Sequence, residues 1–234
     1  MTNDQTSVAL ITGGSRGLGQ ALTRELTKRG WHVIVDARDA DRLSAAVRDL
    51  PAGSVTVVPG DVADSDHRQA LARAVANIGR LDLIVNNASI LGPSPQPHLA
   101  DYPLDVLEQV YAVNTVAPLA LLQLLLPHLE KSRGRVVSVS SDAAVEAYAG
   151  WGGYGSAKAA LDHLTAVLAA EQLTLRVYSF DPGDMATELQ QQAFPNEDVS
   201  DRAAPETVVP ALLRLVGGDL PSGRYRAADL AVTP

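Results

Sequence analysis

SVALITGGSRGLGQAL, residues 7–22, runs from a short apolar segment through a glycine-rich turn into the start of a helical pattern. Gly13, Gly17 and Gly19 remove side chains where a pyrophosphate would approach the backbone, and the amides of the following helix terminus would hold the anion. The spacing is GxxxGxG rather than the GxGxxG of many dinucleotide folds. Its place between a strand and a helix favours a phosphate site over a purely structural turn.

Short β-branched runs alternate with longer helical patterns along the rest of the chain, which is typical of βαβ units. The early runs are continuously apolar, as expected of central parallel strands covered on both faces. The sequence therefore predicts an α/β fold with a doubly wound, parallel, seven-stranded sheet of Rossmann type, forming a single domain over residues 1–234. We expect helices near 17–29, 40–49, 64–78, 103–131, 153–171 and 206–216, a closing strand near 223–228, and long irregular segments at 92–103 and 188–204.

Composition excludes several kinds of function. The chain has no cysteine, which excludes disulfides, thiolate metal sites and a cysteine nucleophile. A net charge of −8 without a basic run argues against a nucleic-acid partner. The longest apolar stretch, residues 116–129, is interrupted by two prolines and is shorter than the roughly 20 residues that span a bilayer, so we expect a buried helix and no membrane partner.

The histidines lack paired ligand spacing, so we predict no metal and interpret each ring as exposed or half-buried; they are His32, His67, His98, His128 and His163. The N-terminal residues MTNDQTSVALITGG have no basic region before their short apolar run, which is unlike a signal peptide. Together with the lack of cysteine, this favours a cytoplasmic location.

A second motif is WGGYGSAK at residues 151–158, where Tyr154 precedes Lys158 by four positions. On a helix this spacing places both side chains on one face. Alone, the pair is more typical of an ordinary amphipathic helix. Three motifs together, TGGSRGLG at 12–19, NNAS at 86–89 and YGSAK at 154–158, resemble the motif set of the short-chain dehydrogenase/reductase family over essentially the whole chain.

The resemblance implies an oxidoreductase that interconverts a ketone or aldehyde and an alcohol by hydride transfer. It implies a catalytic set of Asn114, Ser141, Tyr154 and Lys158. Tyr154 would act as general acid/base, and because the ordinary tyrosine pKa is near 10, we expect the Lys158 cation to lower it. Ser141, thirteen residues before Tyr154, would donate to the substrate carbonyl oxygen, and Asn114 would tether a water that relays protons. The usual family form is NNAG, so Ser89 adds a hydroxyl where the family has none.

The choice between NADP(H) and NAD(H) depends on the end of the second strand. Asp36 could accept hydrogen bonds from the ribose of NAD, whereas Arg38 could neutralise the 2′-phosphate of NADP. In the family's register the acid that selects NAD usually stands at Ala37, and a base one position later marks NADP preference, so we favour NADP(H). The cofactor contacts implied are Gly13, Ser15, Arg16, Gly17, Leu18, Gly19, Arg38, Asp61, Val62, Asn87, Ala88, Tyr154, Lys158, Pro182, Gly183, Met185 and Thr187.

The candidate substrate pocket is mostly apolar and has no clustered base, which favours a neutral, partly apolar carbonyl compound; its expected walls are Leu91, Tyr148, Trp151, Met185 and Phe194. Two alternatives remain. An epimerase or dehydratase with bound cofactor would usually have another glycine spacing and a substrate domain. A non-catalytic NAD(P)-binding sensor or scaffold would not need the proton donor. The resemblance also implies a homodimer or homotetramer formed through the helices at 103–131 and 153–171.

Overall fold

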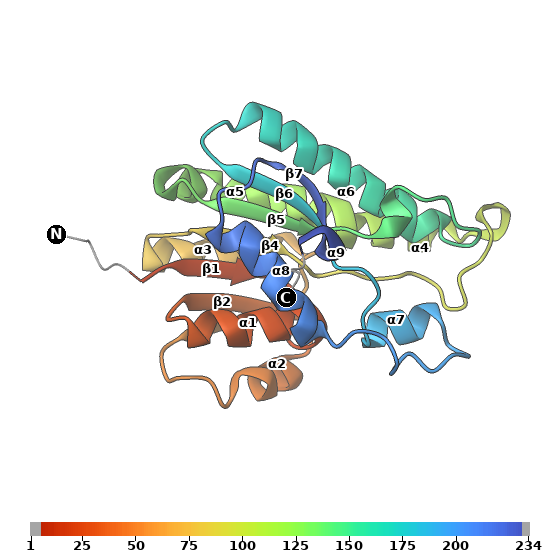
Figure 1. The fold of residues 1–234 in the computed structure, drawn as a ribbon, viewed down its shortest axis with the longest axis horizontal. Coiled ribbons are helices and arrows are strands. Elements are labelled where there is room, and N and C mark those ends of the chain that lie inside the picture. Colours follow the sequence, from red (N-terminus) through yellow and green to blue (C-terminus); the bar gives the residue numbers. More distant parts are fainter. Residues whose placement is uncertain (1–5, 231–234) are drawn as a thin grey trace.

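The computed structural model describes residues 6–230. Residues 1–5 and 231–234, which belong to the expected domain, lie outside the described residues. Seven parallel strands form one sheet in the order β3-β2-β1-β4-β5-β6-β7 (Figure 1). This confirms the predicted doubly wound α/β fold. The order reverses between β1 and β4, which is where such sheets bind ligands. The strands are β1 Val8–Ile11, β2 His32–Ala37, β3 Val55–Pro59, β4 Leu83–Asn86, β5 Arg135–Val139, β6 Arg176–Asp181 and β7 Gly223–Arg226.

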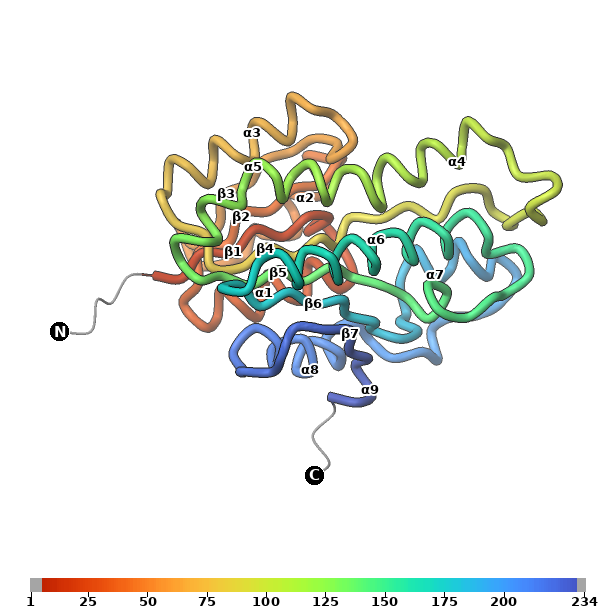
Figure 2. The backbone as a smooth tube through the Cα atoms, turned by 90° about the horizontal axis from the view of Figure 1, so that it is seen from above, coloured from red at the N-terminus to blue at the C-terminus, as the bar shows by residue number. Residues whose placement is uncertain are grey.

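Helices cover both faces of the sheet (Figure 2). One apolar core joins the sheet to α1, α2 and α8, and a second joins the opposite face to α3, α5 and α6. Alternate residues of β1 enter the two cores, with Ala9 and Ile11 on one side and Val8 and Leu10 on the other. The bounds are α1 Gly17–Lys28, α2 Ala40–Val47, α3 Ser65–Ile78, α4 Leu104–Tyr111, α5 Ala117–Ser132, α6 Gly152–Glu171, α7 Glu188–Ala193, α8 Pro205–Gly217 and α9 Ala227–Leu230.

The helix expected over residues 103–131 is interrupted. Its first part, α4, passes into the π-helical segment η2, Ala112–Val116, before α5 begins. The side chain of Asn114, within η2, forms hydrogen bonds with the backbone amide and carbonyl of Ile90, and the wider π-helical turn occurs at this point. Residues 104–132 are long and apolar enough to cross a membrane by length and composition, with a mean hydropathy of 1.6, but half of that window is buried, as in a core helix.

Two further differences lie near the carboxyl edge of the sheet. The segment expected to be irregular at 188–204 begins with α7, whose first turn is capped because the Thr187 hydroxyl accepts from the Gln190 amide at 3.3 Å. The closing strand is shorter than expected, because β7 gives way at Ala227 to the short helix α9. Short 3₁₀ turns, η1 Leu99–Asp101 and η3 Asp142–Ala144, punctuate the loops after β4 and β5.

Candidate active site

A cleft of about 890 Å³ is lined by residues that follow β1, β4, β5 and β6, at the carboxyl ends of those strands. Of the expected site residues, all but Gly19 and Asn114 line it. Among the expected substrate walls, Leu91, Trp151 and Met185 line it too. The lining residues from the expected cofactor and catalytic sets are Gly13, Ser15, Arg16, Gly17, Leu18, Arg38, Asp61, Val62, Asn87, Ala88, Ser141, Tyr154, Lys158, Pro182, Gly183, Met185 and Thr187.

The glycine turn after β1 is packed as its sequence requires. Gly13 has a φ of +71°, which favours glycine, and a Cβ there would lie 2.9 Å from the Cα of Ala88. Gly19 lies beneath the turn, where a Cβ would overlap the carbonyl oxygen of Gly13. This packing explains why Gly19 does not reach the cleft. On the open side, a Cβ at Gly17 would lie 3.4 Å from the methyl carbon of Thr187, so the turn meets the segment after β6.

Both carboxylate oxygens of Asp36 have hydrogen-bond partners within the protein. One of its carboxylate oxygens accepts from the Gly13 amide at 2.8 Å, and the other pairs with His67 Nε2 at 2.9 Å. Burial raises the pKa of the Asp36 carboxyl, while the His67 hydrogen bond opposes that rise. The interpretation of every histidine as exposed or half-buried is wrong for His67, which is 7% exposed. Asp36 therefore holds the glycine turn in place, and the oxygens that could accept from a ribose already accept from Gly13 and pair with His67.

Arginines gather where the turn meets α2. Arg16 and Arg38 line the cleft as expected, and Arg42 joins them from the first turn of α2. The Glu188 carboxylate, at the start of α7, pairs with both Arg16 and Arg42. Burial lowers the pKa of Arg16, and the charges of Arg42 and Arg38 lower it further. Neither Arg42 nor Glu188 was predicted from the sequence, where the only signal was a base four residues after Arg38.

Tyr154 and Lys158 lie side by side on α6. They are 6% and 1% exposed, and Lys158 Nζ lies 5.6 Å from the centroid of the tyrosine ring. Nζ also donates to the carbonyl oxygen of Val139 at 2.7 Å, which ties the lysine to the end of β5. Burial lowers the pKa of Lys158 to about 8, against the opposing effect of Asp162.

The expected direction of the Tyr154 shift is wrong in this structure. Burial raises the pKa of Tyr154 above its ordinary value because the phenolate would lose its hydration. A hydrogen bond with Ser89 acts in the opposite direction, and the charges of Asp142 and Asp181 add to the rise. The phenol is therefore the resting form, and Lys158, whose own ammonium is destabilised by burial, does not reverse this.

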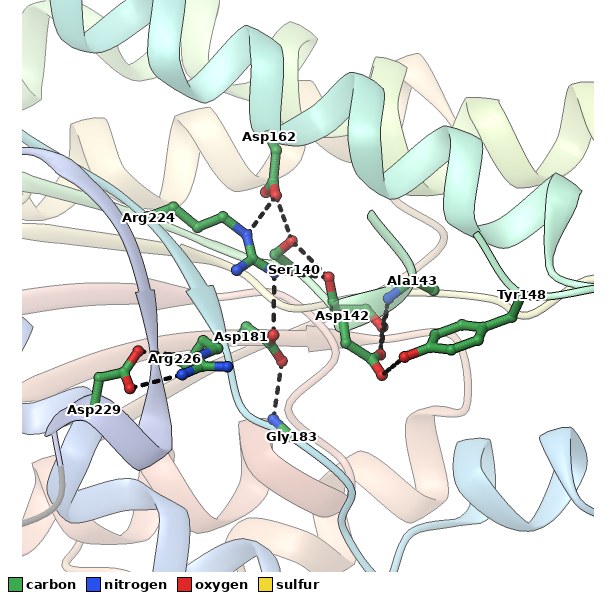
Figure 3. Close-up of polar contacts among 11 residues, drawn as sticks. Ser140, Asp142, Ala143, Tyr148, Asp162, Asp181, Gly183, Arg224, Arg226 and Asp229 are labelled. Carbon is green, nitrogen blue, oxygen red and sulfur yellow. Dashed lines mark hydrogen bonds and ion pairs between the residues drawn. The ribbon is translucent and has the colours of Figure 1, made fainter. Parts of the chain in front are cut away.

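Ser141 lies at the mouth of the cleft, between β5 and η3. Its hydroxyl donates to an oxygen of Asp142 at 2.9 Å and accepts from the Ala143 amide at 3.2 Å. The second oxygen of Asp142 accepts from the Tyr148 hydroxyl at 3.1 Å (Figure 3). Asp142 is thus an acidic neighbour of the proposed carbonyl site. It could not be predicted, because the sequence does not show in which direction a side chain in the loop after a strand points.

Asn114 is fully buried, with its side chain bonded within the protein. Its Oδ1 accepts from the Ile90 amide at 2.9 Å and from the Ser89 hydroxyl at 3.2 Å, and its Nδ2 donates to the Ile90 carbonyl at 2.9 Å. The side chain therefore fixes the loop that follows β4. This explains why Asn114 does not line the cleft, and it assigns a partner to Ser89, the residue that departs from the family form.

The aromatic walls are arranged around Trp151. Tyr148 and Phe194 do not line the cleft, contrary to expectation, but pack against the tryptophan with ring centroids 6.4 and 5.9 Å away. Trp151 in turn meets the ring of Tyr154 edge-on at 5.9 Å. The two outer rings thus support the wall rather than form it. Phe194 directly follows α7, so this wall depends on the position of that helix.

Comparisons with known proteins agree with this geometry. Residues 7–198 match the family model for short chain dehydrogenases. The uncharacterized oxidoreductase YciK of Escherichia coli K12 is 32% identical over 227 residues, covering 94% of this chain and 88% of that protein. Benzil reductase ((S)-benzoin forming) IRC24 of Saccharomyces cerevisiae is 32% identical over 215 residues, covering 88% and 80%. A solved structure from Escherichia coli CFT073, described as a short chain dehydrogenase complexed with NADPH, superposes with a TM-score of 0.87 at 30% identity and coverage of 97% and 99%. The chain therefore belongs to the short-chain dehydrogenase/reductase family and is an NAD(P)-dependent oxidoreductase.

Proposed function

We propose that this protein interconverts a neutral ketone or aldehyde and its alcohol with NADP(H), using Tyr154 as the general acid/base. One observation carries the proposal: Tyr154 and Lys158 are buried as neighbours on α6 and line the same cleft as the glycine turn. A proton donor and a cation thus lie beside a phosphate-binding element. No observation favours the sensor or scaffold, or the epimerase or dehydratase, over this activity.

The cleft fits a dinucleotide. Gly13, Gly17 and Leu18 line the cleft where α1 begins, and the backbone amides of a helix N-terminus can hold a pyrophosphate. When bound, the nicotinamide would give hydride to, or take it from, the substrate carbon. We propose that the lining residues of the expected cofactor set hold this group, with the Thr187 side of the cleft nearest the nicotinamide and the Asp61 and Val62 side nearest the adenine.

The preference for NADP(H) is supported by charge. Both oxygens of Asp36 already accept hydrogen bonds within the protein. Arg38 lines the end of the cleft that follows β2, and Arg16 and Arg42, which share Glu188, line it beside Arg38. A guanidinium group binds a phosphate through charge-assisted hydrogen bonds that a ribose hydroxyl cannot match. The NADPH complex of the Escherichia coli relative is consistent with this preference.

Proton transfer would use the resting states found here. The raised pKa of Tyr154 keeps the phenol protonated, so it can give its proton to the carbonyl oxygen during reduction. Lys158, with a pKa of about 8, is mostly charged at pH 7 and would stabilise the phenolate that forms. The Ser141 hydroxyl, now directed at Asp142, would turn to the substrate oxygen, and Asn114 would anchor the loop beside them.

Further expectations concern the whole protein. We propose a homodimer or homotetramer assembled through the helices at 103–131 and 153–171, because Val116 in η2, Leu119 in α5 and Val167 in α6 expose apolar surface. A chain with a net charge of −8 should have neither nucleic acid nor membrane as a partner, and we propose that it acts in the cytoplasm. A monomer mass by light scattering at micromolar concentration would contradict the assembly.

An assay of NADPH and NADH oxidation with different carbonyl compounds tests the proposed substrate and the proposed cofactor together. Benzil is a suitable first probe, because the wall at Trp151 is aromatic and the yeast relative is named a benzil reductase. The matched probe is an aryl ketone with a carboxylate, which the Asp142 and Asp184 carboxylates lining the cleft should disfavour by about tenfold in kcat/KM. No NADPH oxidation with any carbonyl in a broad panel would defeat the proposal, and faster oxidation of NADH would defeat the cofactor assignment.

A further inference from the structure

Arg224, on the last strand of the sheet, joins three segments with one guanidinium group (Figure 3). Its Nε donates to Asp162 Oδ2 at 3.0 Å. One terminal nitrogen donates both to Asp181 Oδ2 at 3.0 Å and to the carbonyl oxygen of Ser141 at 2.9 Å. These partners come from α6, from the end of β6 and from the loop after β5, so the arginine connects elements far apart in sequence.

Each partner belongs to a segment of the proposed active site. Asp162 lies one helical turn after Lys158, and its Oδ2 also accepts from the Ser140 hydroxyl at 2.8 Å. Asp181 accepts from the Gly183 amide at 3.0 Å through its other oxygen, which shapes the turn after β6. The third contact fixes the backbone of Ser141 itself. The planar guanidinium group of an arginine can donate to all three acceptors at once, whereas the single ammonium of a lysine could not reproduce these directions.

We propose that Arg224 is a positioning residue of this active site, holding Ser141, the lysine-bearing helix α6 and the turn at 181–183 in register with one another. The proposal rests on the proposed function. It assigns a catalytic consequence to the seventh strand, which contributes no residue to the lining of the cleft. No sequence pattern marks Arg224 as a site residue.

The contacts of Arg224 with Asp162 and Asp181 also affect the electrostatic environment of Lys158. Asp162 and Asp181 have side chains only 14% and 5% exposed, and Arg224 is bonded to both. Of the groups near Lys158, Asp162 raises its pKa against burial, while Asp181 and Asp142 raise the pKa of Tyr154. Loss of the arginine charge would leave Asp162 without its paired cation, while Asp181 would keep only the charge of Arg226 nearby. The electrostatic potential at Lys158 would then become more negative.

Two variants separate geometry from charge. Arg224→Lys keeps the charge and loses the planar set of donors, so kcat for benzil should fall by about tenfold or more. Arg224→Gln also loses the charge, so the pKa of Lys158 should rise by about one unit. The matched controls are Arg226→Lys and Arg226→Gln, on the same strand, because among the described hydrogen bonds Arg226 donates only to the exposed Asp229 and acts on Asp181 through its charge alone.

The lysine titration can be read without catalysis. The chain has three lysines, Lys28, Lys131 and Lys158, so protein labelled with ¹³C at the lysine ε carbon gives three NMR signals, and a Lys158→Met sample assigns the buried one. A wild-type protein that turns over no carbonyl would overturn the proposed function, while this titration would still decide whether Arg224 acts on Lys158.

Three results would overturn the positioning role. One is a kcat of Arg224→Lys equal to that of Arg226→Lys. Another is a loss of kcat that only follows the folded fraction measured by circular dichroism. The third is a Lys158 titration in Arg224→Gln that coincides with the wild type. If Arg224→Gln does not fold, the kcat of Arg224→Lys decides alone.

Discussion

Replacing Lys158 with methionine should change how stability depends on pH. The ammonium is buried, and burial lowers its pKa from 10.5 to about 8. Below about pH 8 the native protein carries a charge that is better hydrated in the unfolded chain. Between about pH 8 and 10.5 the native state has lost a proton that the unfolded chain keeps, so the native state gains stability as pH rises. The pKa difference corresponds to about 3 kcal/mol.

Urea unfolding at pH 7 and pH 10.5 measures this directly. The free energy of unfolding of the wild type relative to Lys158→Met should increase by about 3 kcal/mol between the two pH values. The lost hydrogen bond to Val139 and any repacking are the same at both pH values and cancel. Lys131→Met is the control, because that lysine is exposed. If the wild type and Lys158→Met differ in free energy of unfolding by the same amount at pH 7 and at pH 10.5, burial does not destabilise the ammonium, and the lowered pKa of Lys158 is contradicted.

Two substitutions test the cofactor end of the cleft. Arg38→Glu should weaken NADPH binding at least tenfold more than NADH binding, because only NADPH carries the 2′-phosphate; equal losses by fluorescence titration would remove Arg38 from the assignment. Gly19→Ala should abolish binding of both cofactors, because its Cβ would overlap the Gly13 carbonyl oxygen, whereas Gly217→Ala, with no atom within 4 Å of the new Cβ, should bind as the wild type does. Normal binding by Gly19→Ala would contradict the packing of the turn.

The sheet could be predicted because its signals are local. Continuous apolar runs such as VALI at 8–11 are typical of buried parallel strands, and a glycine turn between strand and helix fixes the direction of the chain. The break in the helix at η2 could not be predicted. It depends on hydrogen bonds between Asn114 and Ile90, which lie 24 residues apart and meet only in the folded protein.

The same distinction applies to the site. The four-residue spacing of Tyr154 and Lys158 predicts a shared helical face, and the structure shows their contact. The environment of that pair could not be predicted, since the degree of burial decides the direction of each pKa shift. Asp36 shows the same limit, because its partner His67 lies 31 residues away in the sequence and meets it only in the folded protein.

The central claim is that Tyr154 supplies the proton while the rest of the cleft binds the cofactor. It is tested most directly by measuring NADPH binding and NADPH oxidation with the same neutral ketone in the wild type and in Tyr154→Phe. We expect equal binding and a loss of turnover of about a hundredfold or more in the variant. Turnover by the phenylalanine variant at the wild-type rate would contradict the claim.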